Sequence, residues 1–155
     1  MHFPWTELLV AACAALSATP GQTQQIGEIG VQGIGTSSDP ALVVVGPYGA
    51  LRTSGRTRFS ASVGGGASDG AFAWRAEALG HFLLSPDRRH SWGGYLAGGL
   101  AAVGGPVDRG YIVLTLGVEG RPGSSSGWVA EVGIGGGVRI GLGYRWRRFP
   151  RTWRK

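Results

Sequence analysis

Residues 128–146 read WVAEVGIGGGVRIGLGYRW and alternate between two kinds of side chain. Most residues at even positions from Trp128 to Trp146 are apolar or aromatic, whereas those between them are mainly Glu, Arg and Gly. A period of two residues indicates β-strand, because successive side chains point to opposite faces of the backbone. The apolar face begins and ends in Trp, and the other face carries the charges. This pattern is typical of a strand with lipid outside and a narrow polar lumen inside.

The same alternation recurs along the rest of the chain, between segments rich in turn-forming residues. Gly135–Gly137 is expected to fold the quoted stretch into a final hairpin. Pro47 removes a hydrogen-bond donor, so a bulge or a shorter strand is expected around it. We expect six earlier strands at 26–35, 41–51, 56–63, 71–84, 92–104 and 111–121. The sequence therefore predicts an all-β fold, an eight-stranded antiparallel up-and-down transmembrane β-barrel with both ends on one side.

The composition supports a single domain and excludes several other classes of protein. The 155 residues include 30 Gly, and glycine weakens any helical interpretation. The apolar fraction of 43% is too high for a disordered chain. No apolar run approaches the roughly 20 residues of a transmembrane helix, so a membrane protein of this sequence must be a barrel. The net charge of +6 comes mostly from scattered arginines, which argues against a nucleic-acid partner.

The two ends of the chain are expected to lie outside the barrel. Residues 1–20 contain the short apolar run Leu8–Ala18 and are predicted to be a signal peptide, cleaved near residues 17–20. Cleavage would remove Cys13, the only cysteine, and with it a weak resemblance to a lipoprotein box. The barrel is assigned to residues 21–147. Residues 148–155 form a basic tail, either a solvated terminus or a contact for anionic lipid head groups or cell-wall polymer.

The charged residues on the predicted inner face are the first candidate site. An eight-stranded barrel has an interior just wide enough for side chains to fill it. The charges therefore predict a paired Arg–Glu network that plugs the lumen, because buried charges must be paired. A narrow anion-preferring pore is the alternative, since Arg outnumbers Glu. The predicted lumen network consists of Arg56, Arg58, Arg75, Glu77, Glu119, Arg121, Glu131, Arg139 and Arg145.

Large aromatic residues form the second candidate feature. With the N-terminus on the periplasmic side, four strands would each place one aromatic side chain near the periplasmic rim, facing lipid. Such a ring of aromatics is expected where a barrel crosses the membrane interface. The predicted aromatic girdle consists of Phe82, Trp92, Trp128 and Trp146.

The segment Arg139-Ile140-Gly141-Leu142-Gly143-Tyr144-Arg145-Trp146 resembles the sorting signal in the last strand of bacterial outer-membrane barrels. The chain from about residue 24 to 146 resembles the small eight-stranded barrels of this kind, the OmpA/OmpX-like family. The resemblance implies a place in the bacterial outer membrane, with the lipid bilayer and the barrel-assembly machinery as partners. It also implies that Arg139, Gly141, Tyr144 and Trp146 carry the assembly signal. The tail after Trp146 and the very short predicted extracellular loops depart from many members of the family.

The remaining motifs give no reason to expect catalysis. Outside the predicted signal peptide the histidines are His81 and His90, too few to suggest a metal site, and no cofactor is expected. The function predicted is that of a structural or narrow-pore outer-membrane barrel that is not an enzyme, with an oligomeric state left open. The alternative from another class is a soluble periplasmic or extracellular barrel that binds a small apolar ligand. That alternative requires the faces to be inverted, with Ile, Val and Trp inside.

Overall fold

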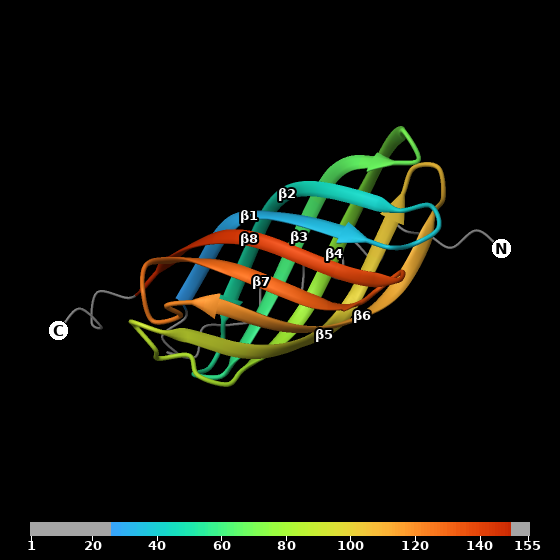
Figure 1. The fold of residues 1–155 in the computed structure, drawn as a ribbon. Helices are drawn as coiled ribbons and strands as arrows, with labels where there is room; N and C mark the ends of the chain where they lie inside the picture. Colours follow the sequence, from blue (N-terminus) through green and yellow to red (C-terminus); the bar gives the residue numbers. More distant parts are fainter. Residues whose placement is uncertain (1–25, 150–155) are drawn as a thin grey trace.

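The computed structural model describes residues 26–149, which form eight β-strands that close into a barrel (Figure 1). The strands are β1 (Ile26–Thr36), β2 (Leu42–Arg52), β3 (Thr57–Ser68), β4 (Ala71–Leu83), β5 (Trp92–Gly104), β6 (Arg109–Gly120), β7 (Ser126–Ile134) and β8 (Val138–Arg148). Each strand pairs antiparallel with its neighbours in sequence, and β1 pairs with β8 to close the sheet. The predicted eight-stranded up-and-down barrel is confirmed. The predicted signal peptide and residues 150–155 of the tail lie outside the described residues.

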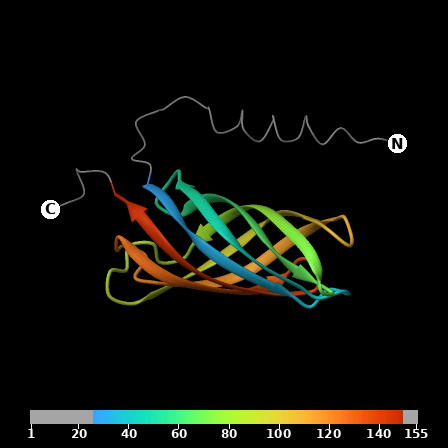
Figure 2. The same cartoon turned by 90° about the horizontal axis from the view of Figure 1, so that it is seen from above.

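The barrel has two distinct ends. β1 begins and β8 ends at the same end, which we call the terminal end (Figure 2). The connections at the terminal end span residues 53–56, 84–91 and 121–125. Those at the opposite end, which we call the mouth, span residues 37–41, 69–70, 105–108 and 135–137. All of these connections except 84–91 have two to five residues, because consecutive antiparallel strands need only a hairpin turn to join them.

The two faces of the sheet differ as the alternation predicts. Along β8 the inward residues from Arg139 to Arg147 are buried, whereas Ile140, Leu142 and Trp146 are exposed on the outside. The same division runs around the barrel, and exposed Ile, Leu, Val, Phe and Trp side chains form an apolar outer surface. The inversion of faces that the soluble alternative requires is therefore not found in this fold. The described residues contain no helix long and apolar enough to cross a membrane.

The second strand is more regular than the sequence suggests. β2 continues without a bulge through Pro47, which lies opposite Val31 in β1. The pairing with β3 keeps one register from Val45 opposite Gly65 to Tyr48 opposite Ser62. The predicted bulge is wrong, because the strand accommodates Pro47 by leaving a gap in its pairing with β3 rather than by inserting a residue.

Glycine residues lie both in a hairpin turn and within a strand. The expected turn at Gly135–Gly137 joins β7 to β8, and Gly136 and Gly137 adopt φ values of 86° and 112°. Only glycine adopts such backbone angles without strain. The third strand was expected at residues 56–63, but β3 runs on through Gly64–Gly66 to Ser68.

Candidate functional site

The interior near the terminal end contains a first cluster of charges, which we call the terminal cluster. Glu28 of β1 and Glu119 of β6 lie at its centre, surrounded by Arg52, Arg58 and Arg147. The Arg52 Nε lies 2.9 Å from Glu28 Oε1 and the Arg147 Nη2 lies 2.9 Å from Glu119 Oε2. Arg58 bridges the two acids, with its Nη1 2.9 Å from Glu119 and 3.3 Å from Glu28. Strands that lie across the barrel from one another are thus tied together through its centre.

A second group, which we call the central cluster, lies further toward the mouth. Arg139 of β8 lies between Glu77 of β4 and Glu131 of β7, with N–O distances of 2.7 Å to each. Its Nε also donates to Glu77 Oε1 over 3.0 Å, so that the guanidinium binds this carboxylate with two donors. Arg75 donates from Nε to Glu77 over 2.7 Å, and the Tyr95 hydroxyl donates to Glu131 over 2.5 Å. Both carboxylates therefore have charged partners.

Arg145 joins the two clusters. Its Nη2 donates to Glu131 over 3.1 Å, and its Nη1 lies 3.8 Å from Glu119. The guanidinium carbon also lies 4.1 Å from the ring centroid of Tyr48, a cation–π distance. The interior polar groups thus form one continuous network from Glu28 to Arg75.

His81 of β4 links the network to Ser60 of β3. Its Nδ1 lies 3.2 Å from Arg58 Nη2, and its Nε2 lies 2.7 Å from the Ser60 hydroxyl. Because a guanidinium can only donate, Nδ1 must accept the bond from Arg58. The ring is therefore neutral, with its proton on Nε2 donated to Ser60 Oγ.

The interior network carries an excess of positive charge. Within residues 26–149, six buried arginines face four buried glutamates, an excess of two cations. Several guanidinium nitrogens, including Arg58 Nε and Arg75 Nη1, are buried without a hydrogen-bond acceptor. Removing one partner from a buried charge pair is costly, so the network holds its strands together most strongly where one carboxylate serves several arginines.

The structure brings together most of the predicted lumen residues but not all of them. Those that lie inside are Arg58, Arg75, Glu77, Glu119, Glu131, Arg139 and Arg145. Arg56 and Arg121 are exposed, and their assignment to the lumen was wrong. Arg56 belongs to a turn in which the Ser54 hydroxyl accepts from the Thr57 amide over 3.1 Å. Arg121 follows the end of β6 with a φ of 50°, a left-handed conformation that interrupts the alternation.

Three network residues were missing from the predicted list: Glu28, Arg52 and Arg147. Glu28 lies on the inner, polar face of β1 together with Gln32. Arg52 and Arg147 continue the period of two beyond the predicted strand ends at residues 51 and 146. Extending the alternation by one residue would have found both.

The aromatic residues of the predicted girdle all lie on the outer face near the terminal end. Trp92 is the first residue of β5, and Phe82 is the last but one of β4. Trp128 and Trp146 flank Tyr144, with ring centroids 5.0 and 5.1 Å from it in edge-on arrangements. The four girdle residues are 48–63% exposed, so they form part of the outer surface of the barrel.

The segment that resembles an assembly signal divides between the two faces. Arg139 and Gly141 point inward, and a Cβ on Gly141 would lie 3.2 Å from Glu131 Oε2. Tyr144 and Trp146 point outward, and the Tyr144 hydroxyl donates to Ser126 Oγ over 2.9 Å. The polar and aromatic parts of the segment therefore have different surroundings in the folded barrel.

The part of the chain that the structure describes contains no group of three or more His, Cys, Asp or Glu side chains that could hold a metal ion. In this part of the chain, both ring nitrogens of His81 already form hydrogen bonds, one with Arg58 and one with Ser60.

Comparison with known proteins gives matches by structure. No family model and no curated protein matches the sequence. The N-terminal β-barrel domain of Pseudomonas aeruginosa OprF superposes with a TM-score of 0.61 at 12% identity, over 78% of this chain and 97% of that one. Neisserial surface protein A superposes with a TM-score of 0.52 at 13% identity, over 84% of this chain and 100% of that one. The likeness shows the fold. It is the fold of the OmpA/OmpX-like barrels.

Proposed function

We propose that this protein is a structural barrel of the bacterial outer membrane, whose lumen is closed by the Arg–Glu network. The observation that carries the proposal is the burial of six arginines and four glutamates inside the barrel, with their charges in mutual contact. Filling the interior with bound side chains holds the strands together across the lumen. It also leaves little room for solute, as expected for eight strands.

The outer surface supports a position in a lipid bilayer. Ile29, Phe72, Ile112 and Leu142 are 62–73% exposed, and many other apolar side chains lie beside them. A soluble monomer rarely exposes a continuous apolar surface of this kind. The aromatic girdle of Phe82, Trp92, Trp128 and Trp146 would then lie at one interface of the membrane.

Fractionation tests this location. We expect the protein to remain with outer membranes and to migrate differently on gels before and after boiling, as a folded barrel does. Release of the protein by osmotic shock, with no heat-dependent change in mobility, would contradict the membrane assignment.

A narrow anion-preferring pore is the second candidate, and the excess of two interior cations favours it. An electropositive lumen would attract anions and repel cations. The two candidates differ in whether the network leaves a path for ions when the barrel is folded.

Planar bilayer recordings on protein whose folding has been checked by gel mobility distinguish them. We expect no conductance from the wild-type protein and a conductance from Arg139→Ala, since that change removes the residue between Glu77 and Glu131. Ile140→Ala, on the outer face of the same strand, is the matched control and should stay silent. Steady anion conductance from the wild-type barrel, lost in Arg75→Gln, would establish the pore instead.

We further propose that Arg139, Gly141, Tyr144 and Trp146 carry the signal for the barrel-assembly machinery. The side chains of Tyr144 and Trp146 lie on the outer face, where a partner could reach them before the sheet closes. Tyr144→Ala with Trp146→Ala should slow assembly in cells more than Trp128→Ala, which removes a neighbouring aromatic outside the segment. Equal assembly rates for these variants would contradict the proposal.

A further inference from the structure

The mouth of the barrel contains a small cavity of about 20 Å³ between the 37–41 turn and the first residues of β6. It is lined by Arg75, Arg109, Tyr111 and Asp39 among its polar and aromatic residues, and by Leu42 and Val103 among its apolar ones. A water molecule needs roughly 10–15 Å³ of such space, so the cavity has room for one or two water-sized bodies.

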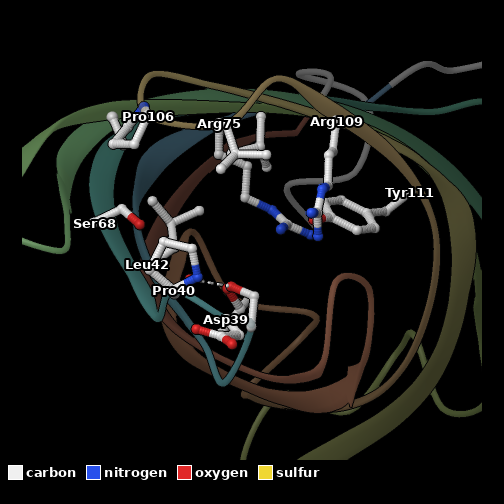
Figure 3. A pocket seen from close by; sticks show the side chains of 13 residues that line it. Asp39, Pro40, Leu42, Ser68, Arg75, Pro106, Arg109 and Tyr111 are labelled. Atoms are coloured by element: carbon white, nitrogen blue, oxygen red, sulfur yellow. Dashed lines mark hydrogen bonds between the residues drawn. The ribbon is translucent and has the colours of Figure 1, made fainter.

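Two arginines reach this cavity from neighbouring positions on the inner face. Val103 of β5 lies opposite Arg75 on one side and opposite Arg109 on the other, which places both arginines in one row across three strands. Figure 3 shows their guanidinium groups pointing toward one another into the opening. Two cations that converge on a shared space repel each other unless an anion lies between them.

The two arginines differ in what already binds them. Arg75 is 1% exposed; its Nε donates to Glu77 and its Nη2 to the carbonyl of Gly135, but its Nη1 has no acceptor. The Arg109 side chain is exposed and forms no ion pair or hydrogen bond with any residue from 26 to 149. A buried donor without an acceptor costs about 1–3 kcal/mol, and an anion beside Arg75 Nη1 would remove that cost.

Asp39 is the only carboxylate of the described residues that lines this cavity. Its side chain lies on the opposite side of the opening from the two guanidinium groups in Figure 3, and it makes no ion pair with Arg75 or Arg109. The Asp39 carboxylate would therefore repel a bound anion, and it does not itself occupy the position between the two guanidinium groups.

We propose that Arg75 and Arg109 form a binding site for a chloride-sized monovalent anion at the mouth of the barrel. Charge selects an anion, and the small cavity favours a chloride-sized ion over a larger one such as gluconate. The proposal does not depend on whether the lumen conducts, because the cavity is lined by the mouth connections and the strand ends beside them.

The test compares unfolding temperatures of the refolded barrel in detergent micelles, in sodium chloride and in sodium gluconate at equal ionic strength. A ligand that binds the folded state raises its stability, so chloride should raise the unfolding temperature of the wild-type protein. Arg109→Gln should abolish the chloride-specific rise and weaken chloride binding about tenfold or more. Arg121→Gln, which changes another exposed arginine at the terminal end, is the matched control and should keep the full rise.

Asp39→Asn distinguishes an anion bound between the two arginines from a direct contact between an arginine and Asp39. If an anion lies between the arginines, removing the competing carboxylate should strengthen chloride binding. The proposal is overturned if the wild-type protein shows no difference between chloride and gluconate. It is also overturned if Arg109→Gln responds to chloride as the wild type does, or if Asp39→Asn weakens chloride binding.

Discussion

The two halves of the barrel interior use the same residue types to different effect. In the terminal cluster, Glu28 and Glu119 lie among arginines from β2, β3 and β8 that each contact a carboxylate. At the mouth, Arg75 has one carboxylate partner, Glu77, and Arg109 has none among the described residues. The buried glutamates lie at the terminal end and in the middle, so the first half is held together by paired charges. The second half keeps one Arg75 nitrogen, Nη1, without an acceptor and an Arg109 side chain without an ion pair among the described residues.

The comparison predicts that the largest loss of stability follows from removing Glu119. This carboxylate lies within 4 Å of nitrogens of Arg52, Arg58, Arg145 and Arg147. Glu119→Gln keeps the volume but leaves four guanidiniums short of one negative charge. The free energy of unfolding should fall by about 3–5 kcal/mol, measured by urea titration of the barrel in lipid vesicles.

Asp87→Asn, in the exposed 84–91 connection, is the matched control for this loss and should change the unfolding free energy by less than about 0.5 kcal/mol. Equal effects of the two substitutions would show that the terminal cluster does not hold the strands together.

Glu77→Gln should lower the free energy of unfolding by less than Glu119→Gln does. This difference would separate the contribution of the central cluster from that of the terminal cluster. Glu77 binds two arginines, Arg75 and Arg139, and Arg139 keeps its contact of 2.7 Å to Glu131. The loss expected in the same titration is about 1.5–3 kcal/mol, the range for hydrogen bonds to charged groups. A loss larger than that of Glu119→Gln would reverse the ranking and place the main support of the interior nearer the mouth.

The terminal end and the mouth can also be compared on the outer face, where a smaller change in stability is expected. At the terminal end, Trp128 packs edge-on against Tyr144, whereas no ring contact of Trp74 is found near the mouth within the described residues. An edge-on aromatic pair contributes about 0.5–1.5 kcal/mol beyond its buried area. Trp128→Leu should therefore destabilise the barrel more than Trp74→Leu in vesicle unfolding by about that amount. Equal losses would mean that the ring contact contributes nothing beyond burial.

The alternation of the sequence was enough to predict the barrel and the direction of most of its side chains. The lipid-facing surface must be apolar and the interior can hold charge, so every strand had to show the same period of two. Arg139 and Arg145 were assigned to the interior on this basis alone, and the structure places both there. The prediction failed at strand ends, where Arg56 and Arg121 leave the sheet while Arg52 and Arg147 remain in it.

Strand ends and ionic partners depend on contacts that one strand does not reveal. Arg147 stays in β8 because its amide donates to the carbonyl of Ser125 in the neighbouring connection over 2.7 Å. Arg58 and Glu119 meet across the lumen although 61 positions separate them in sequence. Their meeting depends on the stagger of eight strands around the closed barrel, which periodicity along one strand does not specify.

The smallest effect expected concerns the turn that closes the terminal end between β6 and β7. Arg121 adopts a φ of 50°, which costs a residue with a Cβ about 1–2 kcal/mol, whereas glycine adopts it freely. Its exposed side chain makes no ion pair with the described residues, and its backbone carbonyl accepts from Ser124 and Arg147. Arg121→Gly should therefore keep those bonds and raise the unfolding free energy by up to about 1 kcal/mol, after the entropy that glycine gains in the unfolded chain is subtracted.

Arg56→Gly, in another exposed turn without a positive φ, is the control and should lower the unfolding free energy slightly. Destabilisation by both substitutions to the same extent would mean that the Arg121 side chain contributes to the terminal end after all.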